Sequence, residues 1–263
     1  DLSPDNDHLI IALNGESNVI IVDLVSFSLQ QSLPVSLMNM NDIVYVNETR
    51  VLISSESDPS VLSLSLSDSS EVYQSIHNGE LVITSDGQFA FVASNTSVKK
   101  YDITNSYAIQ EPYIADPFGF EAMINHFVIS STEDLLLTCL VDPSNNVKIK
   151  DVYAYNPNNL TLSGKYKINS PAMAVAFSPD ESHIFVAPTD ADKSGIYIVE
   201  FDTETKLESH YYLVAGDLKE KGLVVNPDGE YFYVLINSPG DNNSFEPYNN
   251  NSFDLQRVEI ATY

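Results

Sequence analysis

The sequence predicts an all-β protein built from one repeated antiparallel unit. Three observations support this prediction: a sharp turn motif at a regular spacing, an apolar run directly after each turn, and an alternating run of apolar and polar residues further on. Alternation with a period of two is typical of strands that are buried on one face. Helical periodicity is nearly absent, and residues 216–221 are the best candidate for a short helical turn.

The turns combine Ser, Thr, Asn or Pro with an acidic residue. The acidic residues stand at positions 5, 48, 86, 133, 180 and 228, so their spacings are 43, 38, 47, 47 and 48 residues. These residue types suit turns, because Pro presets φ, Asp hydrogen-bonds to its own backbone and Gly takes positive φ. The six turns are SPDN (3–6), VNET (46–49), TSDG (84–87), STED (131–134), SPDE (178–181) and NPDG (226–229).

Each turn precedes two predicted strands, and most units add a more polar fourth strand such as KLESHYYLV (206–214). The apolar runs are HLIIAL (8–13), RVLIS (50–54), QFAFVA (88–93), LLLTCL (135–140), HIFVA (183–187) and YFYVLI (231–236). The alternating runs are NVIIVDL (18–24), SVLSLSL (60–66), SVKKYDI (97–103), VKIKDVYAY (147–155), GIYIVEF (195–201) and LQRVEIA (255–261). Four antiparallel strands in each unit of this length indicate the blades of a β-propeller.

Six units account for the length, and no linker divides them, so we expect one domain over residues 1–263. The first unit begins only two residues before its turn, and the last unit ends after its third strand. We therefore expect an excerpt of a longer chain, with six motifs counted here and seven blades as an alternative for the intact protein. Phe177 and Val175 alternate on a predicted innermost strand and should pack between units.

Three stretches carry the repeat most fully: AMAVAFSPDESHIFVAPTD (172–190), GLVVNPDGEYFYVLIN (222–237) and LVITSDGQFAFVASN (81–95). Their pattern resembles the YVTN-type and lactonase-like propeller repeats of cell-surface and periplasmic proteins. The resemblance spans the chain, loosely in the second and fourth units. It implies a propeller fold and an extracellular, cell-surface or periplasmic location. Its motif residues belong to turns and core, so they specify fold rather than activity.

The charge balance narrows the class of partner. The chain has 12 Lys and Arg against 37 Asp and Glu, a formal net charge of -25. Nucleic acids and anionic lipid surfaces are therefore disfavoured, whereas a cationic ligand, a divalent metal or a need for solubility suits this charge. No apolar run approaches the roughly 18 residues that span a membrane. No cofactor is expected, with calcium as the one alternative.

Three residues are candidates for ligand binding. His126, within EAMINHFVIS (121–130), is expected on an innermost strand, either facing the channel as a base or ligand or satisfied within the wall. Phe245 and Tyr248 belong to the long polar loop SPGDNNSFEPYNNN (238–251), which is either a contact surface or a disordered segment. His8 and His183 occupy the same position of the repeat, which indicates a structural role.

A calcium site is the metal hypothesis. Asp190, Asp192 and Ser194 place oxygen atoms at positions one, three and five of a loop, and Gly195 follows for the sharp turn. Phe201 stands where such loops carry an acidic residue at position twelve. The alternative is an ordinary hairpin turn between the second and third strands of the unit.

The sequence favours a non-enzymatic extracytoplasmic propeller that binds a protein, polymer or small ligand. The resemblance implies one alternative, a lactonase-like hydrolase or lyase with its site at the mouth of the central channel, and another, a subunit of a redox assembly. Hydrolysis needs converging acid, base and cationic groups. The arginines, Arg50 and Arg257, are predicted on a second and a third strand, away from the channel. A His with two or more carboxylates at the channel mouth would favour the enzyme.

Overall fold

The computed structural model consists of strands and turns. It describes residues 1–13, 15–55, 58–74, 76, 79–94, 97–114, 123–142, 147–168, 171–188, 196–214, 217–237 and 253–260. These residues form 22 strands and no helix. The strands make six antiparallel sheets, each from strands consecutive in sequence, which confirms the predicted all-β class and its repeated sheets. The chain divides into two compact units, Asp1–Pro117 and Phe118–Tyr263, so the single domain over 1–263 stays a prediction.

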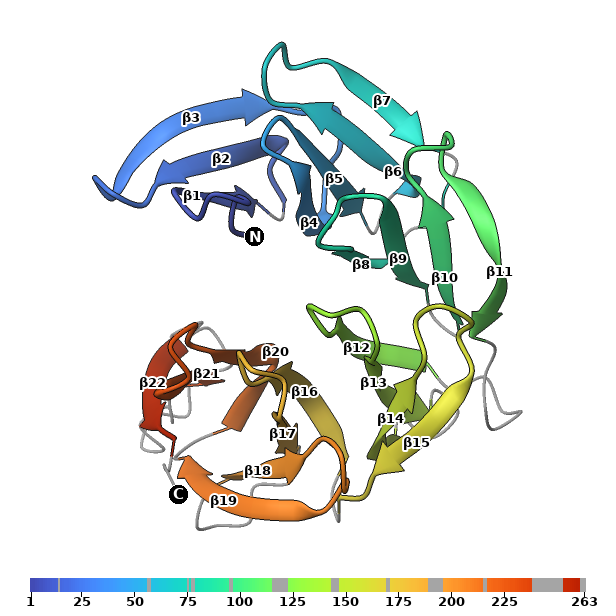
Figure 1. The fold of residues 1–263 in the computed structure, drawn as a ribbon. Coiled ribbons are helices and arrows are strands. Elements are labelled where there is room, and N and C mark those ends of the chain that lie inside the picture. The colour runs from blue at the N-terminus through green and yellow to red at the C-terminus, as the bar shows by residue number, and fades with distance from the viewer. Residues whose placement is uncertain are drawn as a thin grey trace. The chain divides into compact units, whose positions relative to one another are not determined.

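The first unit contains three sheets (Figure 1). Sheet 1 is β1 (His8–Ala12), β2 (Asn18–Asp23) and β3 (Ser28–Pro34). Sheet 2 is β4 (Met40–Asn47), β5 (Arg50–Ser55), β6 (Asp58–Ser65) and β7 (Glu71–Gln74). Sheet 3 is β8 (Glu80–Ile83), β9 (Phe89–Ser94), β10 (Ser97–Asp102) and β11 (Ala108–Ile114). The innermost strand of sheet 1, which the sequence predicts to be nearly missing, is reduced to one antiparallel bridge between Leu2 and Leu9 of β1.

Carboxylates join neighbouring sheets of the first unit. The Asp1 side chain accepts a hydrogen bond from the backbone N–H of Tyr45 in β4, at 2.9 Å. The Asp42 side chain accepts one from the N–H of Leu81 in β8, at 2.7 Å. Apolar clusters fill the space between sheets 1 and 2 and between sheets 2 and 3. Packing and these bonds together hold the sheets in sequence order.

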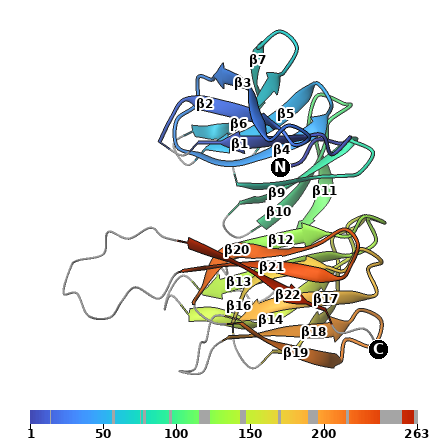
Figure 2. The ribbon, with the colours of Figure 1, turned by 90° about the vertical axis from the view of Figure 1, so that its left-hand side faces the viewer.

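The second unit also contains three sheets (Figure 2). Sheet 4 is β12 (Met123–Ile129), β13 (Leu136–Asp142), β14 (Val147–Tyr155) and β15 (Leu162–Tyr166). Sheet 5 is β16 (Ala172–Phe177), β17 (His183–Pro188), β18 (Ile196–Asp202) and β19 (Glu208–Val214). Sheet 6 is β20 (Asp217–Val225), β21 (Tyr231–Asn237) and β22 (Phe253–Glu259). The first strands β12, β16 and β20 lie side by side.

In sheets 2 to 5 the second strand is largely apolar, because both of its faces are buried. In β17, Ile184 and Val186 pack into the cluster between sheets 4 and 5, whereas Phe185 packs into the cluster between sheets 5 and 6. All three are at most 1% exposed. This double burial explains why HIFVA does not alternate, while the outer strand β19 alternates between exposed and buried residues. The predicted second and third strands are confirmed in all six sheets.

One local prediction was wrong. Residues 216–221 were expected as a helical turn, but Asp217–Val225 form the extended strand β20. It pairs with β21 from Asp217 opposite Asn237 to Val225 opposite Phe232, with an irregularity between Leu218 and Leu223. Pairing with β21 on both sides of this irregularity overrides the helix propensity of the Lys and Glu residues between them. Within the described residues, no helix has the length and apolar character needed to cross a membrane.

Candidate functional site

Five of the six sheets enter their second strand through the same six-residue turn. Its first residue donates its backbone N–H to the carbonyl of the sixth, and the N–H of the fourth donates to the carbonyl of the first. The fourth residue takes a positive φ in every case: Asn6 (61°), Gly87 (68°), Glu133 (57°), Glu181 (58°) and Gly229 (73°). The turns begin at Ser3, Thr84, Ser130, Ser178 and Asn226. We call this the repeat turn.

The side chains of the repeat turn form a second set of hydrogen bonds. In sheet 5, the Ser178 hydroxyl accepts from the N–H of His183 and donates to the carboxylate of Asp180. Asp180 also accepts from the N–H of Ser182. Ser3 and Asp5, and Thr84 and Asp86, repeat this pattern. The hydroxyl bonds are the main cause that holds the pKa of Asp5, Asp86 and Asp180 below its ordinary value.

Sheets 2 and 4 depart from the alignment that the sequence predicts. In sheet 4, Glu133 is the fourth residue of the turn rather than the third, so the predicted alignment is one residue off. The carboxylate there comes from Asp134, which accepts from the hydroxyls of Ser130 and Thr132. In sheet 2, Asn47 pairs directly with Arg50, which makes a two-residue hairpin without the repeat turn.

The end of the third strand meets the repeat turn. The N–H of Thr203, just after β18, donates to the carbonyl of Ser182, the fifth residue of the turn. Sheets 1, 3 and 6 make the equivalent bond from Leu24, Ile103 and Ile260. The turn that leads into the second strand and the connection that follows the third strand therefore lie at the same end of a sheet, which we call the turn end. Two cavities open at the turn end of the second unit.

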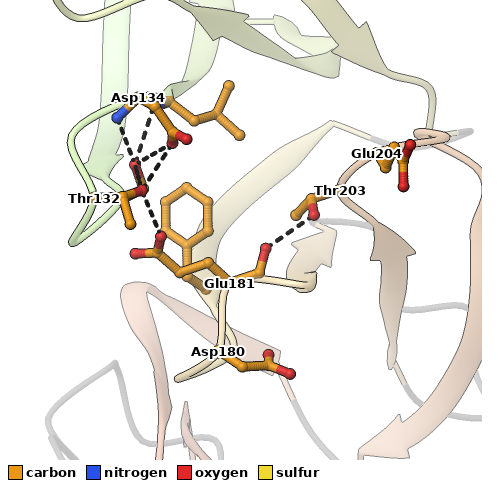
Figure 3. Close-up of a pocket in the computed structure, with 9 residues that line it drawn as sticks. Thr132, Asp134, Asp180, Glu181, Thr203 and Glu204 are labelled. Carbon is orange, nitrogen blue, oxygen red and sulfur yellow. Dashed lines mark hydrogen bonds between the residues drawn. The ribbon is translucent and has the colours of Figure 1, made fainter.

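The first cavity, the sheet 4–5 cleft, has a volume of about 410 Å³. Figure 3 shows Thr132 and Asp134 on one side of it, Thr203 and Glu204 on the other, and Glu181 between them. Its lining consists of Ser130, Thr132, Asp134, Leu135, Phe177, Asp180, Glu181, Thr203 and Glu204. Glu181 bridges the two sheets, because its carboxylate accepts hydrogen bonds from the N–H of Ser131 and, at 2.8 Å, from the hydroxyl of Thr132.

Phe177 forms part of the apolar lining of this cleft. It is half-buried against the core cluster between sheets 4 and 5, in which Val175 is 1% exposed. Phe177 thus lies between two sheets, as the sequence predicts, but with one part of its ring open to the cleft. Four carboxylates and no Lys or Arg line the cavity, so its potential is negative.

The second cavity, the sheet 5–6 cleft, has a volume of about 400 Å³. Its lining consists of Ser178, Pro179, Asp180, His183, Phe185, Glu200, Asp228, Gly229 and Ile260. Glu200 is the unusual member, because it is a carboxylate that is only 3% exposed. It accepts hydrogen bonds from the hydroxyls of Ser209 and Tyr212. The Nε2 atom of His183 lies 3.5 Å from its Oε1 atom.

The residue type at the position of Glu200 differs from sheet to sheet. Glu200 stands opposite Phe185, and the equivalent third-strand residues are Ile21 in sheet 1, Lys100 in sheet 3, Ala154 in sheet 4 and Arg257 in sheet 6. Lys100 lies 4.1 Å from the centre of the Phe89 ring, and Arg257 lies 4.5 Å from that of Tyr231. These cations stack on the aromatic sixth residue of their turns. In sheet 5 that sixth residue is His183, and its neighbour is an anion.

His126 is the sequence-predicted site residue that the structure describes, and it is not part of either cleft lining. His126 lies in β12, is 9% exposed, and its Nε2 atom is 3.3 Å from the carbonyl oxygen of Val175 in β16. It thus connects two first strands, as Asp42 does in the first unit. Phe245 and Tyr248, and the calcium candidates Asp190, Asp192 and Ser194, lie outside the described residues. Within the described part of the chain, no three His, Cys, Asp or Glu residues are grouped to hold a metal.

Sequence reasoning missed both clefts and Glu200. A signal was present in GIYIVEF (195–201), where a Glu occupies a position that the alternation assigns to the buried face. A second signal was the recurrence of Asp followed three residues later by Ser, Asn or Thr at the end of third strands, as in Asp202 and Thr205. These residues cap the connection that borders the sheet 4–5 cleft.

No protein-family model matches the chain, and no curated protein matches it in sequence. Several solved structures share its fold. A chain of the Kuenenia stuttgartiensis hydrazine synthase has a TM-score of 0.72 at 16% identity, over 89% of this chain and 71% of that one. A chain of a mitotic checkpoint complex has a TM-score of 0.70 at 15% identity, over 89% and 69%.

A third similar structure is the dihydro-heme d1 dehydrogenase NirN in complex with DHE. Its TM-score is 0.65 at 14% identity, over 90% of this chain and 50% of that one, so this chain spans half of its length. At such identities the likeness shows the fold alone. The six sheets are the blades of a β-propeller. The four-stranded blades are sheets 2 to 5, and sheets 1 and 6 have three named strands each.

Proposed function

We propose that this protein is a binding module that acts outside the cytoplasm and takes a cationic segment, rich in Lys or Arg, at the turn end of sheets 4 to 6. The observation that carries this proposal is the composition of the two clefts. Six carboxylates line them together with apolar side chains, and the linings contain no Lys or Arg. These carboxylates belong to Asp134, Asp180, Glu181, Glu200, Glu204 and Asp228.

The geometry suits a long cationic side chain. Leu135 and Phe177 in one cleft, and Phe185 and Ile260 in the other, offer apolar surface to the methylene stem of a Lys or Arg. The carboxylates around them attract its charged head, and a concave site with walls of low dielectric constant concentrates that field. The net charge of -25 adds long-range attraction for a cationic partner.

Two comparisons support the biological setting. The similar chain in the mitotic checkpoint complex belongs to a protein assembly, which supports an interaction role for this fold. The resemblance of the Ser-Pro-Asp and Asn-Pro-Asp-Gly stretches to cell-surface and periplasmic propeller repeats supports a location outside the cytoplasm. Both are arguments from likeness, and propellers host many unrelated functions.

The proposal is tested by binding of a fluorescent, acetylated oligolysine peptide, with oligoglutamate as the negative probe. Asp134→Asn with Glu204→Gln removes two exposed charges from the lining of the sheet 4–5 cleft. The variant should weaken oligolysine binding by about twofold to thirtyfold, because each exposed charge pair contributes about 0.2–1 kcal/mol. Glu16→Gln with Glu48→Gln removes two exposed charges from the first unit and is the matched control. Equal losses for both variants would mean that net charge alone attracts the peptide.

A lactonase-like hydrolase is the second candidate, and one observation favours it. His183 shares the sheet 5–6 cleft with three carboxylates, which is a combination that general acid and base chemistry requires. The cluster lies between sheets 5 and 6 of the second unit. Hydrolysis of a sugar lactone by the protein, lost in His183→Gln, would establish the enzyme. Unchanged hydrolysis in that variant would remove this cleft as its site.

A further inference from the structure

The sheet 4–5 cleft and the sheet 5–6 cleft lie on the two sides of one repeat turn, Ser178–His183. Asp180, the third residue of this turn, lines both clefts. Phe177 directly precedes the turn, packs toward sheet 4 and lines the first cleft, whereas Phe185 packs toward sheet 6 and lines the second. Each cleft therefore has its own apolar floor, and the two clefts share one carboxylate.

The repeat turns of sheets 4, 5 and 6 contact one another in a row. Glu181 of the sheet 5 turn accepts hydrogen bonds from Ser131 and Thr132 of the sheet 4 turn. On the other side, Pro179 lies against the sheet 6 turn, because a Cβ atom added at Gly229 would be 3.6 Å from the Cδ atom of this Pro. Neighbouring sheets pack about 10 Å apart, so we expect about the same distance between the centres of the two clefts.

The chain's own cations show how a cation can lie at a repeat turn. In sheets 3 and 6, Lys100 and Arg257 extend from the third strand over the aromatic sixth residue of the turn, at 4.1 Å and 4.5 Å from the ring centre. Sheets 4 and 5 carry Ala154 and Glu200 at this position. No Lys or Arg is among the described residues that line either cleft. The carboxylates of both clefts are therefore available to a cation from a ligand.

We propose that the two clefts hold two cationic side chains of one segment at the same time, one on each side of the sheet 5 repeat turn. This inference rests on the proposed function and adds a spacing requirement to it. The two cations share Asp180. The other carboxylates belong to one cleft each: Asp134, Glu181 and Glu204 to the sheet 4–5 cleft, and Glu200 and Asp228 to the sheet 5–6 cleft.

The distance of about 10 Å between the clefts selects the conformation of the segment. In a polyproline II segment, side chains three residues apart lie on the same side and about 9 Å apart, since the rise is about 3.1 Å per residue. In a β-strand, the same-side spacings are about 7 Å and about 13 Å. The ligand class is therefore a Pro-rich basic segment with Lys or Arg at two positions that are three residues apart.

Two proline rulers of equal charge test this spacing. The short ruler is acetylated, amidated Lys-Pro-Pro-Lys, and the long ruler has five Pro residues between its two Lys residues, which places the same-side cations about 19 Å apart. A ¹⁵N NMR titration at low ionic strength reports on both clefts through the amide signals of Thr203 and Gly229. The short ruler should bind at least about threefold more tightly, because its linker holds the second cation at a millimolar effective concentration. Both amides should titrate with the same dissociation constant.

Two single variants separate the clefts. Glu204→Gln changes the lining of the sheet 4–5 cleft alone, and Asp228→Asn changes that of the sheet 5–6 cleft alone. Both side chains are exposed, and Asn keeps an oxygen that can accept from the N–H of Glu230. Each variant should bring the ratio of the two ruler affinities closer to one. Glu16→Gln removes an exposed charge of the first unit and should leave the ratio unchanged, because both rulers carry the same charge.

The outcomes separate this inference from the proposed function. If neither the rulers nor oligolysine binds, the proposed cationic ligand is refuted, and the paired site with it. Binding of oligolysine without binding of the short ruler, or equal affinities for the two rulers, refutes the paired site alone. A preference for the short ruler that Glu204→Gln or Asp228→Asn leaves unchanged also overturns the paired site, because one of the two clefts then takes no part in binding.

Discussion

The repeat turns of sheet 1 and sheet 5 have the same backbone and different surroundings. Ser3–His8 and Ser178–His183 make the same two backbone hydrogen bonds, the same Ser-to-Asp bond, and positive φ values of 61° and 58° at the fourth residue. The equivalent position of the third strand is occupied by Ile21 in the sheet of His8 and by Glu200 in the sheet of His183. The turn is therefore a structural device of the repeat, and the chemistry comes from residues that the repeat leaves open.

The largest effects are expected from substitutions in the buried strands that follow the two turns. Phe185 is 1% exposed and packs on the rings of Tyr212 and Phe232, and Ile10 is its 1% exposed equivalent in sheet 1. Phe185→Ala should lower the free energy of unfolding by about 3–5 kcal/mol and Ile10→Ala by about 2–5 kcal/mol, since both leave a cavity. Urea denaturation measures both. A loss below about 1 kcal/mol for Phe185→Ala would contradict its place in the core.

The second prediction replaces Glu200 of sheet 5 by isoleucine, the residue type that sheet 1 has at the equivalent position, Ile21. Glu200→Ile removes the acceptor of the Tyr212 hydroxyl, a residue that is 5% exposed. The loss should be about 1–3 kcal/mol, because a buried hydroxyl loses its partner. Adding Tyr212→Phe to Glu200→Ile should recover part of the lost stability, because the buried hydroxyl that lost its acceptor is then removed as well. Strictly additive effects of the two changes in thermal denaturation would show that Glu200 and Tyr212 are not coupled.

The third prediction compares the two turns directly. Ser3→Ala and Ser178→Ala each remove the hydroxyl that accepts from the sixth residue's N–H and donates to the turn Asp. Each should cost about 1–2 kcal/mol, the range for a partly buried hydrogen-bonding group. Similar values measured by chemical denaturation would confirm a common role. A near-zero cost in both sheets would mean that the backbone bonds alone hold the turn.

The fourth prediction concerns acid. The pKa values of Asp5 and Asp180 are lowered in the folded protein, mainly by the hydroxyls of Ser3 and Ser178, and that of Asp68 in sheet 2 is lowered to about 2. Such groups stabilise the fold above the unfolded pKa of about 3.9, and this contribution is lost as the pH falls through the lower folded values. The melting temperature should therefore decline below about pH 4. Asp5→Asn and Asp180→Asn should each make that decline shallower.

Much of the fold could be predicted because it depends on local patterns. Turn chemistry and the double burial of HIFVA are written in adjacent residues, so the second and third strands were predicted close to their observed bounds. The strand over Asp217–Val225 could not be predicted, because its Lys and Glu residues favour a helix and the pairing with β21 that makes it a strand involves the residues on either side of them.

The site could not be predicted for a different reason. Glu200, His183 and Asp228 come from three separate stretches. The pairing of β17 with β18 brings His183 close to Glu200, and the packing of sheet 5 on sheet 6 adds Asp228 to the same cleft. His126 was recognised as a residue of a first strand, but its contact with the carbonyl of Val175 depends on the neighbouring sheet. Periodicity shows which face of a strand is buried, but it does not show which residues of the next sheet that face meets.

The smallest effects are expected at the fourth residue of the turn, and there the two sheets should differ in sign. Asn6 and Glu181 both take positive φ, which costs a non-glycine residue about 1 kcal/mol, less for Asn, and which Gly adopts freely. Asn6→Gly should therefore change stability by a few tenths of a kcal/mol at most, in the stabilising direction. Glu181→Gly gains more backbone relief but loses the bonds to Ser131 and Thr132 that join sheets 4 and 5, so it should be destabilising. Thermal denaturation of the two variants decides the matter, and a stabilised Glu181→Gly would show that the bridge across the sheet 4–5 cleft contributes less than the relief of its backbone.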